Sequence, residues 1–223
     1  MDNKFWILDA GHGGMIDGIY QSAKKFDPGN KKTWNKLWYH SLTNETIFEG
    51  VVNRLIVDQI HIMCNKYSIA HHILIPEQKD ISLQTRVNRA NDLYKVHKNA
   101  VYLSIHCNAI NKSNQGTGWE VWTSKGYTKS DKIASIFFNE ATNEFPLMKM
   151  RSGYHDPNEK VKDADKEANF KVLKSTDMPA LLTENFFMNN YDPDFKLLNN
   201  SYGVKRIANC HIRAMSRCNQ INF

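Results

Sequence analysis

Short apolar runs alternate with longer amphipathic stretches along most of the 223-residue chain. Short runs rich in branched and aromatic residues predict strands, and the longer stretches with a helical period predict helices. The predicted strands are 5–9, 70–75, 100–107, 118–123, 169–173 and 180–186. The predicted helices are 47–65, 82–94, 129–145 and 204–215, of which the second begins at a Ser82 cap. Strands that alternate with helices predict an α/β sandwich around a central sheet that is mostly parallel or mixed.

Residues 15–48 interrupt this pattern, because they are polar and aromatic without a clear period. They contain the turn signal Asp-Pro-Gly-Asn at 27–30. We interpret the segment as an inserted excursion rather than a linker, because Trp34, Trp38 and Tyr39 would be costly to leave in water. No repeat or low-complexity tract divides the rest, so we predict one domain over residues 1–223.

Composition is that of an ordinary globular protein, with 41% hydrophobic and 23% charged residues. No apolar run approaches the roughly 20 residues of a membrane span. The N-terminal MDNKFWILDAGHGG leads directly into a predicted active-site strand, so we do not interpret it as a signal peptide. We therefore expect synthesis in a cytoplasm without export by the general secretory route.

Charge and cysteines add little about function. The net charge of +6 and the pI near 9.0 come from scattered residues, with no run of five or more Lys or Arg, and do not identify a partner. The cysteines form no CxxC pair and each has apolar neighbours, so we expect free thiols in the core. They are Cys64, Cys107, Cys210 and Cys218.

Chemically active side chains follow three of the predicted strands. His12 comes just after the first strand, His106 lies near the end of the third, and Glu184 lies near the end of the last. Open α/β sheets bind ligands outside the carboxyl ends of their strands, so these side chains are expected at one edge.

A further carboxylate lies in the apolar stripe of the helix predicted from residue 47. At 100° per residue, Glu49 falls in the middle of this stripe, in the first turn. A carboxylate directed at a core must be paired or bound to a metal, and Asn53 on the same face is a candidate hydrogen-bond partner. Glu45 in the excursion is the rival carboxylate.

Two imidazoles and one carboxylate form a known catalytic zinc set that leaves a position for water. Zinc lowers the pKa of that water and polarises a carbonyl, and Glu184 is placed to carry protons, so the set suits amide hydrolysis. Each residue alone has a structural explanation: a strand-end histidine is often only hydrogen-bonded, and Glu49 could merely favour the helix dipole. Their coincidence at one edge favours the catalytic interpretation.

At these residues the chain resembles the zinc-dependent N-acetylmuramoyl-L-alanine amidase family (type 3). The similar segments are DAGHGG, Glu49 with Asn53-Arg54-Leu55, SLQTR followed by AN, SIHCNA, GWEV and PALLTENFFMNN, in order from about residue 4 to residue 190. The resemblance implies a three-layer sandwich, a twisted, mixed, mostly parallel sheet of about six strands with helices on both faces.

The resemblance also implies roles for single residues. His12, Glu49 and His106 would bind one zinc ion, and Glu184 would be the catalytic general base and acid. Asn108, at the end of the SIHCNA strand, and Arg151, where the family has a basic residue near its groove, are candidate substrate contacts. We expect Arg86 to pair with a carboxylate inside the fold rather than to touch substrate.

Two departures from the family stand out. The stretch between His12 and Glu49 is much longer than usual, and we interpret it as a structural flap in preference to a sugar-binding floor. Asn185 and Phe186 follow Glu184, where the family more often has a small residue and Gly. These two residues are expected to reshape the substrate groove without moving Glu184.

Together these features predict an enzyme that hydrolyses the amide bond between N-acetylmuramic acid and L-alanine in peptidoglycan. We expect a phage endolysin that reaches the wall with the help of a holin-type protein. A bacterial cell-separation amidase domain and a non-catalytic peptidoglycan-binding module of the same fold are the alternatives. A nucleic-acid binder ranks last, because the sequence has no DNA-recognition motif.

Overall fold

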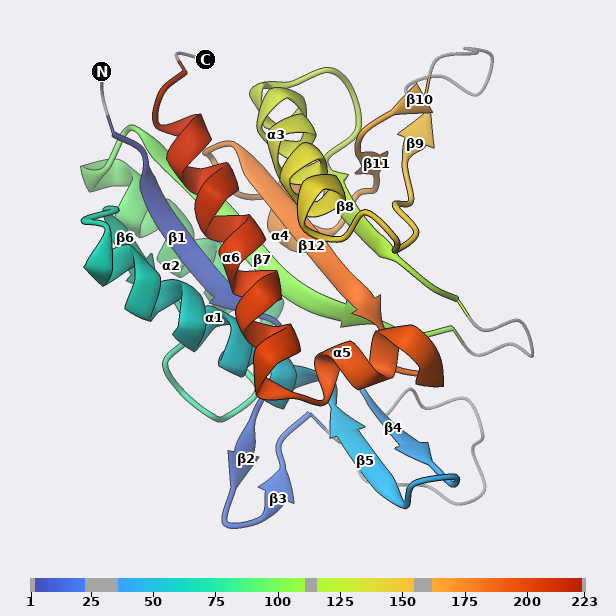
Figure 1. The fold of residues 1–223 in the computed structure, drawn as a ribbon. Coiled ribbons are helices and arrows are strands. Elements are labelled where there is room, and N and C mark those ends of the chain that lie inside the picture. The colour runs from blue at the N-terminus through green and yellow to red at the C-terminus, as the bar shows by residue number, and fades with distance from the viewer. Residues whose placement is uncertain (1–2, 23–35, 111–115, 155–161, 222–223) are drawn as a thin grey trace.

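A mixed sheet of six strands lies at the centre of the computed structural model, which describes residues 3–22, 36–110, 116–154 and 162–221. Its strand order is β11-β8-β12-β7-β1-β6 (Figure 1). Strands β12, β7, β1 and β6 are mutually parallel, whereas β8 runs antiparallel to β12 and parallel to β11. The strands are β1 (Phe5–Ala10), β6 (His71–Ile73), β7 (Ala100–Asn108), β8 (Trp119–Thr123), β11 (Lys166–Glu167) and β12 (Ala180–Phe187). The predicted mixed, mostly parallel sheet is confirmed.

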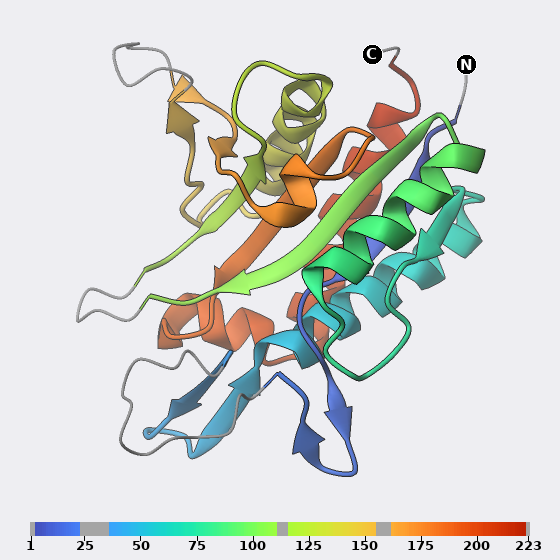
Figure 2. The ribbon, with the colours of Figure 1, turned by 180° about the vertical axis from the view of Figure 1, so that it is seen from behind.

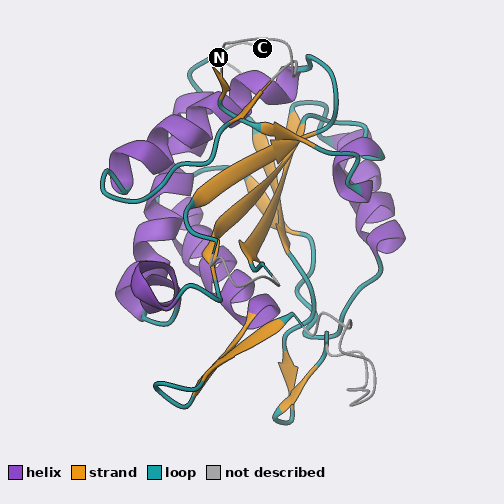
Figure 3. Cartoon of the chain, turned by 90° about the vertical axis from the view of Figure 1, so that its right-hand side faces the viewer, coloured by secondary structure: helices purple, strands orange, loops and turns teal. Residues whose placement is uncertain are grey.

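Helices cover both faces of this sheet, which confirms the predicted three-layer architecture. One face carries α1, α3 and α6, and the other carries α2 and α4 (Figures 1 and 2). Figure 3 shows the sheet between its two helical layers. The helices are α1 (Glu49–Lys66), α2 (Leu83–Val96), α3 (Lys129–Glu144), α4 (Lys171–Lys174), α5 (Lys196–Leu198), α6 (Ser201–Cys218) and the π-helix η1 (Tyr191–Phe195).

Side chains alternate along the strands between two hydrophobic cores. On β7, Val101, Leu103 and Ile105 point to the core under α1, α3 and α6, whereas Tyr102 points to the core under α2 and α4. Burial on both faces explains why the central strands are nearly continuous apolar runs. The same alternation places the polar ends of β1, β7 and β12 on the α2 side, where the site forms.

The strand predicted at 169–173 is wrong, because this segment forms the short helix α4. Val172 and Leu173 are adjacent and both buried, which a helix allows and a half-exposed strand does not. The sixth strand is instead β11, whose two residues, Lys166 and Glu167, carry no apolar signal. The sheet's hydrogen bonding, rather than the local sequence, defines this edge strand.

The described part of the excursion forms two hairpins, seen at the bottom of Figure 1. In the first, β2 (Met15–Ile16) pairs with β3 (Ile19–Tyr20), and in the second β4 (Leu37–His40) pairs with β5 (Glu45–Phe48). Asp17 and Gly18 both have positive φ, the type I′ geometry that suits a two-residue hairpin. Trp38 packs against the larger core and Tyr39 is exposed, which favours a structural flap; Trp34 lies outside the described residues. A third hairpin joins β9 (Gly153–Tyr154) to β10 (Lys162–Asp163).

All four cysteines are buried free thiols, as predicted. Burial raises the pKa of the Cys64 thiol to about 12.

Among the described residues, no helix is both long enough and apolar enough to cross a membrane. That residues 1–223 form one catalytic domain stays a prediction.

Candidate metal centre and active site

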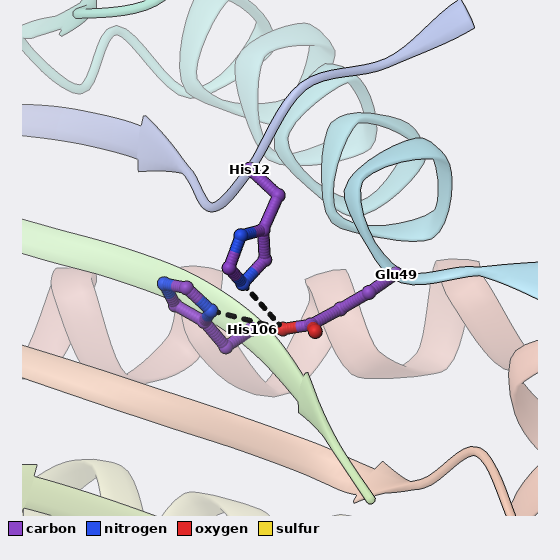
Figure 4. Close-up of side chains that lie close together, drawn as sticks. All are labelled: His12, Glu49 and His106. Atoms are coloured by element: carbon purple, nitrogen blue, oxygen red, sulfur yellow. Dashed lines mark hydrogen bonds and ion pairs between the residues drawn. The ribbon is translucent and has the colours of Figure 1, made fainter. Parts of the chain in front are cut away.

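His12, Glu49 and His106 converge at the carboxyl ends of β1 and β7 (Figure 4). Glu49 Oε1 lies 3.0 Å from His106 Nδ1 and 3.2 Å from His12 Nε2. Glu45, the rival carboxylate, instead accepts a hydrogen bond from Asn199 Nδ2. The structure thus brings together the three predicted metal ligands.

The residues present fit a metal ion. A tetrahedral zinc ion with bonds of about 2.0–2.2 Å holds its ligand atoms roughly 3.3 Å apart, close to the separations of the Glu49 and histidine atoms. His12 Nε2 is buried and makes no hydrogen bond to any described residue. Burial lowers the pKa of His106, which favours the neutral imidazole that a metal requires. Burial opposes ionisation of Glu49, yet the charge of His12 and the hydrogen bond from His106 hold its pKa well below the usual range.

Close backbone approach is needed to assemble this site. A Cβ on Gly11 would lie 2.2 Å from His106 Cε1, and one on Gly50 would lie 1.9 Å from the Gly13 carbonyl oxygen. Glycine at these two positions therefore lets the loop after β1 contact both β7 and the start of α1. His12 itself has a φ of 65°, a left-handed conformation that is uncommon for a non-glycine residue and is typical of functional sites.

The excursion braces the helix turn that carries Glu49. The Lys36 carbonyl accepts hydrogen bonds from Glu49 N at 2.9 Å and from the Tyr20 hydroxyl at 3.0 Å. The same hydroxyl accepts from Gly50 N at 3.0 Å. Two backbone donors at the start of α1 are thereby satisfied, although Phe48 offers no side-chain cap. Lys36 Nζ also lies 3.4 Å from Glu49 Oε2.

Asn53 does not pair with Glu49, contrary to the sequence-based expectation. Its Nδ2 donates to the Gly11 carbonyl at 3.1 Å. Arg54, the next residue, donates to the His12 carbonyl at 2.9 Å. Helix α1 therefore fixes the loop that bears His12 as well as supplying Glu49.

Arg86 is buried and pairs with Asp9 inside the fold, which confirms its predicted structural role. Its guanidinium also donates to the Ala10 carbonyl at 2.8 Å and to the His12 carbonyl at 3.1 Å. Asp9 Oδ2 additionally accepts from the Tyr102 and Ser104 hydroxyls. This network fixes the end of β1 from the α2 side.

Glu184 stands directly beside His106 in the parallel register of β12 and β7. Its Oε2 is buried and has no hydrogen-bond partner among the described residues. Burial raises the pKa of Glu184 well above its usual range, and the nearby Glu49 carboxylate raises it further. Two neighbouring carboxyl groups whose pKa values are pushed apart in this way can divide the roles of ligand and proton carrier.

A cleft of about 640 Å³ opens over these residues and is lined by His12, Lys36, His106, Phe170 and Glu184 among others. Asn108 and Arg151 do not line it. Their Nδ2 and Nε atoms instead donate to Glu120, a buried carboxylate that also pairs with Lys166. The substrate roles of Asn108 and Arg151 stay predictions.

Glu120 and Lys36 are two polar residues of this region that sequence reasoning did not single out. Glu120 lies opposite Glu184 in the antiparallel register of β8 and β12. Its signal was a carboxylate on the alternating face of an otherwise apolar strand, WEVWT. Lys36 lies within the excursion, which has no clear period, so the sequence held no signal for its position.

Asn185 and Phe186 lie in the core rather than in the groove that they were expected to reshape. Asn185 is fully buried and accepts a hydrogen bond from the Trp119 indole at 2.8 Å. Phe186 is buried with a φ of 67°, at the register shift between Glu184 and Phe187. Glycine adopts this conformation without strain, which explains why Gly suits the position and why Phe there must be held by packing.

A buried histidine lies behind β12 and is connected to this segment. His211 Nδ1 donates to the Ile207 carbonyl at 2.8 Å, which leaves Nε2 to accept from the Thr183 hydroxyl at 3.0 Å. Asn185 Nδ2 donates to the same hydroxyl and to the His106 carbonyl. Burial lowers the pKa of His211 to about 4.

The low pKa of His211 predicts that the stability of the folded protein depends on pH. Between about pH 6.5 and pH 4 the unfolded chain binds a proton at residue 211 that the folded protein does not, so stability is lost as the pH falls. The loss from this group amounts to about 3 kcal/mol. Urea unfolding at both pH values should show a shallower loss for His211→Gln than for wild type. His72→Gln, at an exposed position, should keep the wild-type slope, and an equally shallow slope there would contradict the assignment.

Fold and site together define an α/β protein with a candidate metal centre and a neighbouring acid at the carboxyl edge of its sheet. A family model described as N-acetylmuramoyl-L-alanine amidase matches residues 7–217. The chain belongs to this family.

Individual relatives agree with this placement. The chain is 25% identical over 217 residues to an endolysin of Bacillus phage SPP1, covering 97% of this chain and 66% of the relative. It is 33% identical over 141 residues to the N-acetylmuramoyl-L-alanine amidase CwlM of Bacillus licheniformis, covering 61% and 46%. The chain thus spans less than two thirds of either curated relative.

Solved structures share the fold. An N-acetylmuramoyl-L-alanine amidase from Clostridium difficile 630 aligns with a TM-score of 0.72 at 21% identity, over 97% of both chains. The amidase AmiC2 of Nostoc punctiforme aligns with a TM-score of 0.70 at 18% identity, over 99% of both chains. At this identity the likeness supports the architecture alone.

Proposed function

We propose that the protein is a zinc-dependent hydrolase that cuts the amide bond between N-acetylmuramic acid and L-alanine in peptidoglycan. The observation that carries this proposal is the convergence of His12, Glu49 and His106, with Glu184 beside them and facing the same cleft. Membership of the amidase family supports the choice of bond.

His12, Glu49 and His106 would hold the ion, which when bound supplies a Lewis acid for the scissile carbonyl and lowers the pKa of a water. Glu184 would accept a proton from the attacking water and donate it to the leaving nitrogen of alanine. Its raised pKa suits this second step, because the acid must be able to carry a proton near neutral pH.

Lys36 supports the same chemistry from the excursion. Its ammonium lies near Glu49 Oε2 and lines the cleft, so it favours the ionised form of Glu49. Phe170 and Leu83 give the cleft apolar walls, against which the lactyl and alanyl methyl groups of the substrate would pack.

Metal removal tests the proposal. Protein treated with a chelator should lose release of alanine amino groups from purified murein, and stoichiometric zinc should restore it. In the chelated protein the three ligands hold no ion, and Glu184 alone cannot polarise the scissile carbonyl. Full activity in protein shown by elemental analysis to lack metal would contradict the proposal. Murein binding without new amino groups, with or without zinc, would favour the non-catalytic module.

The biological setting is also proposed. Similarity to the SPP1 endolysin over 97% of this chain supports a phage endolysin, which would act on the cell wall after a holin-type protein allows it to reach the wall. Peptidoglycan is then the partner, with no role for nucleic acid. Expression of this protein alone and together with a holin-type protein tests the endolysin setting. Lysis of the cell should require both proteins.

A further inference from the structure

A second cluster of carboxylates lies away from the His and Glu centre, where β8, α3 and the β10–β11 connection meet. Asp131, Asp163 and Asp165 each offer an oxygen within 4.8 Å of the others. Asp131 and Asp165 are buried, with 4% and 1% of their surface exposed. Like charges gathered in a buried position need a compensating partner.

One oxygen of each buried carboxylate is already satisfied. Asp131 Oδ2 accepts from Thr128 N at 2.7 Å and from Thr128 Oγ1 at 2.9 Å, in the capping box of α3. Asp165 Oδ2 accepts from the Thr123 hydroxyl at 2.5 Å.

The second oxygen of each is buried and unpaired. Among the described residues, Asp131 Oδ1 and Asp165 Oδ1 have no hydrogen-bond partner, and no lysine or arginine forms an ion pair with either side chain. Both unpaired oxygens belong to members of the same carboxylate cluster, and a cation bound there would satisfy them.

We propose that Asp131, Asp163 and Asp165 bind a hard divalent cation of the calcium type. Carboxylate oxygens without nitrogen or sulfur donors favour calcium or magnesium over zinc. Calcium binds oxygen at about 2.3–2.6 Å, so two of its ligands lie at most about 5 Å apart, and oxygens within 4.8 Å of one another can share such an ion.

Bound calcium would link the substrate side of the sheet to α3. Asp165 immediately precedes Lys166, which pairs with Glu120 beside Glu184. Asp163 belongs to β10 and Asp131 to the first turn of α3. One ion would therefore connect α3, β10 and the connection between β10 and β11.

Protons are the competing explanation for the orphan oxygens. Burial raises the pKa of Asp165 to about 7, and Asp163 and Asp131 raise it too. A protonated Asp165 could donate to a neighbouring carboxylate without any metal. The experiment must distinguish a shared proton from a bound ion.

Calcium titration of the full-length, zinc-loaded protein tests the site by calorimetry and thermal unfolding, at constant ionic strength. We expect a dissociation constant on the order of 0.1 mM, and about 10 mM calcium should raise Tm by roughly 5–10 °C. Asp165→Asn keeps the acceptor for Thr123 but should weaken binding at least about 10-fold, because it removes one anionic ligand. Asp163→Asn serves as a second variant should Asp165→Asn fold poorly.

Two controls make the result specific. Asp92→Asn removes an exposed charge on α2 and should bind calcium as wild type does. Glu49→Gln alters the His and Glu centre and should also keep calcium binding. No calcium-dependent heat or Tm shift in wild type would overturn the proposal in favour of a shared proton. Equal calcium binding by wild type and both aspartate variants would overturn the proposal, because the calcium would then bind elsewhere. Loss of calcium binding in Glu49→Gln would overturn it for the same reason.

Discussion

Glu184→Gln should reduce murein hydrolysis by about 10²–10⁴-fold while zinc content stays at the wild-type level. Glutamine has nearly the same shape but cannot accept the proton of the attacking water or return it to the leaving amine. The side chain is not part of the metal cluster, although it stands beside His106 in register. Amine release and elemental analysis on the same preparation measure both quantities.

The matched control is Glu77→Gln, which removes one carboxylate from an exposed pair with Arg89. Its activity should equal that of wild type, since it lies outside the lining of the active-site cleft. Loss of zinc from Glu184→Gln would show that Glu184 is a ligand, so that the roles of the carboxylates are misassigned. Retained activity with normal zinc would remove Glu184 from the mechanism.

Arg86→Met should lower the free energy of unfolding by about 3–5 kcal/mol. The substitution leaves the Asp9 side chain buried, at 1% exposure, without its cation. It also removes donors to the Ala10 and His12 carbonyls, so the loop that bears His12 should loosen. Urea unfolding measures the loss, and weaker zinc retention should accompany it.

Arg89→Met is the control on the same helix, because Arg89 pairs with Glu77 where both side chains are more than a third exposed. Its cost should be about 0–1 kcal/mol. Adding Asp9→Asn to Arg86→Met should recover part of the stability, because the uncompensated charge is then gone. Equal costs for the two arginine variants would contradict the buried-pair interpretation.

Long elements with a clear period were predictable from the sequence. Helix α1 was expected at 47–65 and begins at Glu49, and Ser82 caps α2 as expected by accepting from Thr85 N. Such elements bury one face along their whole length, so their apolar pattern is visible in the sequence. Strand β11 was missed because its pairing with β8 is set by tertiary contacts, and α4 was misread because four residues are too few to show a helical period.

The candidate site was predictable as far as its chemistry lies at strand ends. His12, His106 and Glu184 follow from the parallel order of β1, β7 and β12, and Glu49 follows from its place in the apolar stripe of α1. The hydrogen-bond partners were less predictable, because Asn53 donates to the Gly11 carbonyl, in the loop after β1, rather than to Glu49 one helical turn before it. Lys36 depends on the path of the excursion, which no local pattern encodes.

The contacts between the excursion and α1 have a practical consequence for shortening this chain. The two groups that receive the first amide hydrogens of α1, the Lys36 carbonyl and the Tyr20 hydroxyl, both lie between His12 and Glu49. A shortened variant without those loops would keep every proposed ligand, but Glu49 would lose the contacts that hold it in position. Longer or stiffer hairpins grafted at the same point should therefore change the affinity for the ion without altering the atoms that bind it.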